Sequence, residues 1–143
     1  MKKQSRKITS RRKAREIALE ALYRIEVAND ATEDILKDIF SRSKPKPDIQ
    51  DYAKRLVKET TAHLRDIDKI IEEVAENWEL SRIAIIDKNI LRFAICEILY
   101  FDDIPPKVSL DEAIEIAKKY STENSGRFVN GVLDKVIKVY NLI

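Results

Sequence analysis

Apolar residues recur every three or four positions along most of the chain, which is the spacing of helices that bury one face. The first such face combines the following residues: Ala14, Ile17, Ala18, Ala21, Leu22 and Ile25. The most apolar face runs from Ile83 to Leu99 and predicts the central core helix. No segment alternates apolar and polar residues as a half-buried strand does. The pattern therefore predicts an all-α fold with six or seven helices.

Turn and capping residues divide this pattern into segments. We expect helices at about residues 10–28, 32–41, 48–78, 83–99, 109–120 and 126–140. The third segment is too long for one straight helix, so we expect a break at Thr60-Thr61 or near Arg65-Asp66. Pro105 and Pro106 cannot continue the core helix. Ser109 and Glu112 have the spacing of a capping box, which predicts that the next helix begins at Ser109.

Basic residues are concentrated at the N-terminus, although the net charge of the 143 residues is only +2. Residues 1–15 hold eight basic side chains and no acidic one, while the remaining 128 residues hold 19 basic and 25 acidic side chains. With Thr9 or Ser10 as its cap, the first helix would carry Arg11 and Arg12 in its first turn. The partial positive charge of a helix N-terminus disfavours cations there, so an external anion is expected.

This charge distribution is typical of a nucleic-acid-binding arm. We expect residues 1–9 to form a flexible basic arm that contributes Lys2, Lys3, Arg6 and Lys7 to nucleic-acid binding. A tail that only increases solubility is the alternative, because basic runs of this kind are common.

Residues suited to catalysis or metal binding are scarce. His63 is the only histidine and has no cysteine near it in the sequence, so we expect an ordinary histidine and no metal site. The chain has no glycine-rich phosphate loop, and we predict neither a cofactor nor an enzymatic activity. The lone Cys96 and the lack of a membrane-spanning apolar run favour a cytoplasmic protein.

The last helix begins with residues suited to binding an unpaired base. Phe128 lies at the edge of the apolar face, and Asn124 and Arg127 are close enough to reach outward. An aromatic side chain there can stack on a base, although covering the core is the simpler role for Phe128. Gly131 costs about 1 kcal/mol relative to alanine inside a helix, so we expect another backbone or a ligand to approach it.

Five segments in this order resemble the NusB family of transcription antitermination factors. They are Arg11-Arg12-Lys13-Ala14-Arg15-Glu16 with Ala21-Leu22-Tyr23, Leu91-Arg92-Phe93-Ala94, Asp103-Ile104-Pro105, Asp111-Glu112-Ala113-Ile114-Glu115, and Phe128-Val129-Asn130-Gly131-Val132-Leu133-Asp134. The last segment is the most specific, and together they span nearly the whole chain. The resemblance implies one NusB-like RNA-binding domain over residues 1–143, built from two packed helical bundles.

The resemblance also implies a function without catalysis. Members of the family bind boxA-type nascent RNA together with NusE, a small-subunit ribosomal protein, and support antitermination of ribosomal RNA transcription by RNA polymerase. By its motifs it assigns Arg11, Arg12 and Arg15 to phosphates, and Asn124, Arg127 and Phe128 to bases or the RNA backbone. It assigns the partner surface to Tyr23 and Asp87.

Other functions stay open at this point. A protein-interaction adaptor that binds no RNA directly would use the same basic arm on an acidic protein. A small hydrolase or transferase would need titratable groups that only the fold brings together. A homodimer that hides the RNA or NusE surface until a partner arrives leaves no pattern in the sequence.

Overall fold

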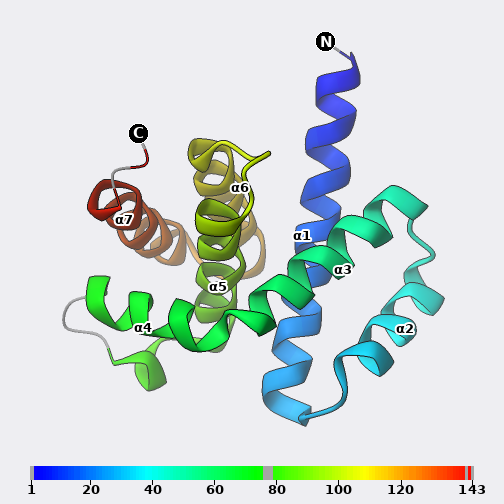
Figure 1. Cartoon of the computed structure of the whole chain (residues 1–143), viewed down its shortest axis with the longest axis horizontal. Coiled ribbons are helices and arrows are strands. Elements are labelled where there is room, and N and C mark those ends of the chain that lie inside the picture. The colour runs from blue at the N-terminus through cyan, green and yellow to red at the C-terminus, as the bar shows by residue number, and fades with distance from the viewer. Residues whose placement is uncertain (1, 76–78, 141, 143) are drawn as a thin grey trace. The chain divides into compact units, whose positions relative to one another are not determined.

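The computed structural model describes residues 2–75, 79–140 and 142, with side chains from Arg11 onward. This part of the chain contains seven α-helices and one short 3-10 helix, and no strand (Figure 1). They are α1 (Lys2–Ala28), α2 (Thr32–Ser43), α3 (Pro47–Ala62), α4 (Leu64–Val74), η1 (Leu80–Arg82), α5 (Ile85–Tyr100), α6 (Pro106–Tyr120) and α7 (Glu123–Val139). The predicted all-α class and number of helices are confirmed.

The chain divides into two compact units, Met1–Lys58 and Glu59–Ile143. In the first unit, α1 packs against α2, and an ion-pair network on the surface joins them. Arg24 donates to Asp38 at 2.7 Å, and Arg42 donates to Glu20 at 2.6 Å. The hydrogen bond from Arg24 is the main reason why the pKa of Asp38 lies below its usual value.

The second unit is built around α5, which packs against α4, α6 and α7. Every residue of α5 from Asn89 to Ile98 is buried, as expected for the central core helix. Two of these residues are charged and are held by partners in the same unit. Arg92 donates from Nε and Nη2 to the carboxylate of Asp68, at 2.8 and 2.9 Å, which is the two-point geometry that favours an arginine–carboxylate pair.

Glu97 is the second buried charge on α5. Its partner, Ser109, was predicted to start the next helix, and the structure contradicts that prediction. Helix α6 begins at Pro106, whose fixed φ suits the first helical position, rather than at Ser109. Ser109 therefore lies inside the helix and does not cap it. Its hydroxyl donates to Glu97 Oε1 at 2.7 Å, with both residues buried.

Three other predicted boundaries also change. Helix α1 begins at Lys2 instead of after a cap at Thr9 or Ser10, so Arg11 and Arg12 are interior helix positions. The long third segment breaks at His63, between the two predicted positions, and its predicted last residue, Trp78, lies outside the described residues. Helix α7 begins at Glu123, inside the predicted loop.

We predict that Ser109→Ala lowers the free energy of unfolding by about 1–3 kcal/mol, because it removes a donor from a buried carboxylate. Urea unfolding measured by circular dichroism would test this. Ser41→Ala is the control, because the Ser41 hydroxyl is exposed and bonds only a backbone oxygen on α2. It should change stability by less than about 0.5 kcal/mol. Equal effects of the two substitutions would contradict the role given to Ser109.

Candidate nucleic-acid interface

The predicted RNA-binding residues fall into two groups, one in each unit. The first group lies on α1 and the second at the start of α7. Lys2, Lys3, Arg6 and Lys7 are helical positions of α1 whose side chains lie outside the described residues.

The α1 group is organised around the ring of Tyr52 on α3. The guanidinium carbons of Arg11 and Arg15 lie 5.2 and 5.8 Å from the ring centroid, within the range of cation–π attraction. Arg11 and Arg12 are half-buried, so part of each side chain faces solvent. The helix thus presents two cationic side chains one position apart, with Arg11 oriented by an aromatic ring.

Arg15 differs from the two arginines before it. It is only 1% exposed and is among the largest fully buried side chains. A phosphate contact requires accessible N–H groups, so this position does not favour the predicted contact. The burial follows from helix geometry, since Arg15 lies between Ala14 and Ile17 on the α1 face that is buried.

The start of α7 is held in place by hydrogen bonds around Ser125. Thr122 caps the helix, because its hydroxyl oxygen accepts from the backbone N–H of Ser125 at 3.1 Å. The Ser125 hydroxyl donates to Asp87 Oδ2 on α5 at 2.9 Å. With that proton in use, the 2.7 Å contact between the hydroxyls of Ser121 and Ser125 has Ser121 as its donor.

Asp87 is buried, whereas a residue that binds a partner protein was expected to be exposed. It is 7% exposed, and its hydrogen bond to Ser125 joins the first turns of α5 and α7. Its other oxygen, Oδ1, is buried and accepts no hydrogen bond from the described residues. The geometry favours a role in positioning α7 over direct contact with a partner.

One face of α7 presents the second group. Asn124, Arg127 and Gly131 are exposed, and Phe128 is half-buried between this face and the core. The half-burial of Phe128 is compatible with both roles considered for it, covering the core and stacking on a base.

The two glycines of the chain have opposite surroundings. A Cβ at Gly126 would lie 3.2 Å from Cγ of Lys118, so the close approach between α6 and α7 occurs there. A Cβ at Gly131 would meet no described atom within 4 Å. No described backbone approaches Gly131, so the first of the two expected explanations for this glycine is wrong. The second explanation, a ligand that binds close to Gly131, stays a prediction.

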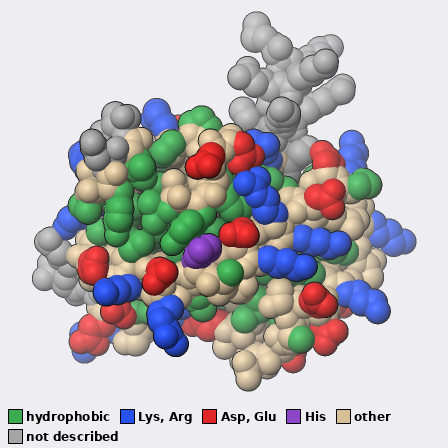
Figure 2. Space-filling view, in the orientation of Figure 1, with side chains coloured by type: hydrophobic (Ala, Val, Ile, Leu, Met, Phe, Trp, Pro, Cys, Tyr) green, Lys and Arg blue, Asp and Glu red, His purple; other side chains and the backbone are tan. Residues whose placement is uncertain are grey.

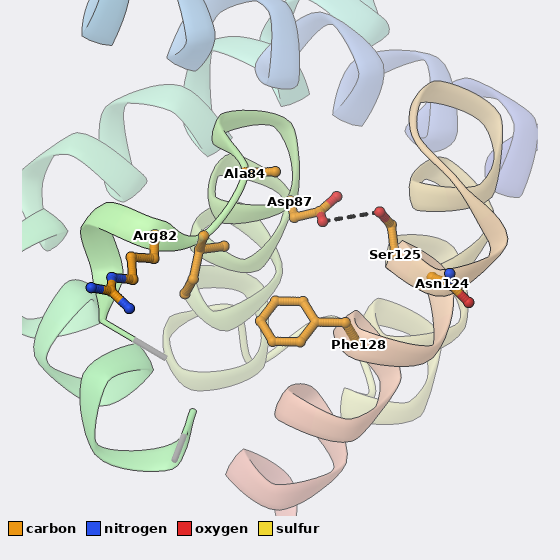
Figure 3. A pocket seen from close by; sticks show the side chains of 7 residues that line it. Arg82, Ala84, Asp87, Asn124, Ser125 and Phe128 are labelled. Atoms are coloured by element: carbon orange, nitrogen blue, oxygen red, sulfur yellow. Dashed lines mark hydrogen bonds between the residues drawn. The ribbon is translucent and has the colours of Figure 1, made fainter. Parts of the chain in front are cut away.

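A pocket of about 300 Å³ opens beside Phe128 (Figure 3). The residues lining it come from η1, the start of α5 and the start of α7: Arg82, Ile83, Ala84, Asp87, Asn124, Ser125 and Phe128. The ring of Phe128 projects from α7 toward the middle of the pocket, with Arg82 at the opposite end from Asn124. Sequence reasoning missed Arg82, because its segment lies some forty residues before α7 and has no motif of its own.

Other features of the described residues give no sign of a metal or membrane site. They contain no group of three or more histidine, cysteine or acidic residues placed to hold a metal ion. No helix among them is long and apolar enough to span a membrane. His63 is partly exposed and stacks on Tyr100 with ring centroids 3.8 Å apart, as expected for an ordinary histidine. In Figure 2 apolar side chains lie on one side of it and acidic side chains lie nearby on the others.

The remaining predicted partner residue, Tyr23, lies on the surface of α1. It is 37% exposed, and Val27, one turn further along, is 58% exposed. Two exposed apolar side chains at this spacing form a small surface suited to a protein contact.

Sequence comparisons place these features in a family. The model of the NusB family matches residues 12–138. The chain is 46% identical over 136 residues to the transcription antitermination protein NusB of Pseudothermotoga lettingae, covering 93% of this chain and 94% of that protein. It is 47% identical over 132 residues to NusB of Chloroherpeton thalassium, covering 89% of this chain but only 61% of that longer relative.

Solved structures give the same result. NusB of T. maritima has a TM-score of 0.83 and 40% identity, covering 90% of each chain. A chain in a crystal structure of antitermination factors NusB and NusE in complex with dsRNA has a TM-score of 0.85 and 30% identity, covering 92% of this chain and 98% of that one. The match to the family model includes α1 from Arg12 onward and the exposed start of α7, and this chain belongs to the NusB family.

Proposed function

We propose that this chain is a transcription antitermination factor that binds boxA-type nascent RNA together with NusE. It acts in the cytoplasm as an adaptor within the RNA polymerase antitermination complex and catalyses no reaction. Membership of the NusB family and the similar chain solved with NusE and RNA support this proposal.

The observation that carries the proposal is the exposed face at the start of α7. An aromatic ring, an amide and a guanidinium lie within one turn, on Phe128, Asn124 and Arg127. A base can stack on the ring, its edge can bond the amide, and the guanidinium can bind a phosphate. The hydrogen bond from Ser125 to Asp87 fixes this turn before RNA arrives, which reduces the entropy lost on binding.

The basic positions of α1 supply further phosphate contacts in this proposal. Arg11 and Arg12 are partly accessible, and the four basic positions before them continue the positive charge along the same helix. Such contacts position the RNA without reading its sequence.

The strandedness of the RNA follows from the chemistry of Phe128. Bases in a duplex are already paired and stacked, so an aromatic side chain recognises them best in single strands or loops. We therefore propose single-stranded boxA-type RNA as the ligand, while the similar NusB–NusE structure contains dsRNA. A duplex of the same sequence is the necessary competitor in any binding test.

NusE would dock on the exposed apolar pair formed by Tyr23 and Val27. The surface around this pair on α1 carries the ion-pair network of Glu20, Arg24 and Asp38, which can orient a charged partner. Asp87 contributes indirectly, by holding the start of α7.

The test is a gel-shift series with a boxA-type single strand, with and without NusE, at several salt concentrations. Replacing Arg11 and Arg12 with glutamine should weaken binding to all RNA sequences alike. It should also make the slope of log affinity against log salt shallower by about 0.7 for each lost phosphate contact. Lys138→Gln is the control, because this exposed lysine pairs with Asp134 at the far end of α7.

Three results would contradict parts of the proposal. A salt response that is flat for the wild-type protein would exclude the phosphate contacts. Stronger binding to the duplex would exclude the single-stranded ligand. Binding to NusE that survives nuclease treatment, with no RNA bound in any combination, would favour the protein-interaction adaptor instead.

Gly131→Ala offers a test in which stability and binding change in opposite directions. The added methyl group meets no described atom, so the substitution should raise the free energy of unfolding by about 1 kcal/mol through helix propensity alone. If RNA passes close to α7, the same methyl group should weaken RNA binding severalfold.

Thermal unfolding and the gel shift together measure both effects of Gly131→Ala. Gly126→Ala is the comparison, because its Cβ would crowd the side chain of Lys118 on α6 and the gain in stability should be smaller. A stabilised Gly131→Ala protein with unchanged RNA affinity would show that RNA does not approach this part of α7.

A further inference from the structure

A second pocket lies in the first unit, between α2 and α3 (Figure 1). This lysine groove has a volume of about 410 Å³ and is lined by residues of the two helices: Glu33, Leu36, Lys37, Phe40, Lys54 and Lys58. Leu36 is buried and Phe40 is half-buried, whereas the three lysines are exposed. The groove therefore combines an apolar surface with positive charge, and none of its lining residues belongs to α1 or α7.

The two helices that form the lysine groove are joined by a short loop held by hydrogen bonds. Lys44 adopts a left-handed conformation with φ of 45°, and its backbone N–H donates to the carbonyl of Phe40 at 2.9 Å. The side chain of Gln50 on α3 donates to the carbonyl of Pro45 at 2.8 Å, and Pro45 is buried. A groove whose walls are connected in this way loses little entropy when a ligand enters.

The lysines of the groove can bind an external anion. Lys58 contacts Glu33 on the opposite helix at 3.9 Å, and these side chains are 58% and 85% exposed. A long and exposed ion pair contributes little to stability, so an incoming carboxylate can compete with Glu33. The ammonium of Lys54 lies 5.7 Å from the centroid of the Phe40 ring, within the range of cation–π attraction. An anion that binds Lys54 is thus brought close to the apolar surface as well.

Two observations favour an acidic protein segment over RNA in this groove. The ammonium of Lys54 lies over the ring of Phe40, so a base would find that face of the ring occupied. The two helices also lack an excess of positive charge, because α2 carries three acidic and two basic side chains and α3 carries three of each. A long polyanion gains little from such a surface. A short peptide segment can instead place single carboxylates beside the lysines and an apolar side chain between them.

We infer that the lysine groove docks an acidic segment of a partner protein, one that carries an apolar side chain between carboxylates. The apolar side chain packs against Leu36 and Phe40, and the carboxylates pair with Lys54 and Lys58. The inference goes beyond the proposed function, because this surface needs neither RNA nor the exposed pair formed by Tyr23 and Val27.

A selection from a displayed library of random short peptides tests the chemistry of the occupant. The full chain is the target, and peptides that also bind the double variant Lys54→Gln, Lys58→Gln are removed. The surviving peptides should be rich in aspartate and glutamate around a large apolar residue. Survivors without an excess of acidic residues, or no survivors at all, would overturn the inference.

Fluorescence anisotropy with the most enriched peptide measures what each lysine contributes. Replacing Lys37, Lys54 or Lys58 singly with glutamine should weaken binding by about two- to fivefold, as expected for one exposed ion pair. Lys54→Arg should bind as the wild-type protein does, because it keeps the charge, and added salt should weaken binding. Lys107→Gln is the matched control, because this lysine is 82% exposed and pairs with Asp111 on its own helix, α6. Circular dichroism confirms that each variant is folded.

The same variants test RNA as the alternative occupant. A boxA-type single strand should not displace the peptide, and the lysine variants should bind this RNA with NusE as the wild-type protein does. Displacement of the peptide by RNA, together with weaker RNA binding by Lys54→Gln, would show that the groove binds RNA and would overturn the inference. Equal peptide affinity of the wild-type protein and all three lysine variants would overturn it too. Both results would leave the RNA contacts proposed for α1 and α7 standing.

Discussion

The candidate interface in the second unit depends on one hydrogen bond, from Ser125 on α7 to Asp87 on α5. Helix α5 is the buried centre of this unit, so this bond ties the start of α7 to the core of the unit. Ser125 lies one residue after Asn124 and three before Phe128. Fixing Ser125 therefore fixes the stretch of helix from which the amide and the ring project onto the exposed face. The carboxylate suits this role because burial leaves it dependent on the hydrogen bond that it accepts.

Helix α5 also shows how a core can hold charged groups at its most buried positions. Arg92 is paired with Asp68, and Glu97 accepts from Ser109 on α6. Each bond joins α5 to a different neighbouring helix. Hydrophobic packing alone tolerates small rotations of one helix against another, whereas a buried charge that depends on a directional bond to a neighbouring helix penalises them. The surface at the start of α7 is therefore presented by a scaffold in which both helix packing and helix rotation are specified.

The sequence predicted what depends on local periodicity and missed what depends on tertiary contacts. The apolar stripes located the helices, and α5 was recognised as the core helix because its apolar face was the densest. The capping box at Ser109 was wrong because a serine followed by an acidic residue at the third position has the same pattern inside a helix. Only its contact with Glu97 reveals the difference. The pocket could not be predicted either, since Arg82, Asp87 and Phe128 belong to three elements with no common spacing.

The arginines of α1 were predicted to bind an anion from a premise that the structure contradicts. The expected anion was inferred from cations in a first helical turn, but α1 begins at Lys2, so Arg11 and Arg12 lie more than two turns inside the helix. The helix dipole acts mainly within the terminal turn and has little effect on them there. The conflict moves to Lys2 and Lys3, since the first turn of α1 contains no acidic residue. What supports Arg11 as a phosphate contact is instead its accessible position over Tyr52 and the positive charge that precedes it. If the proposed RNA passes along this helix, its phosphates would interact favourably with the accessible parts of Arg11 and Arg12.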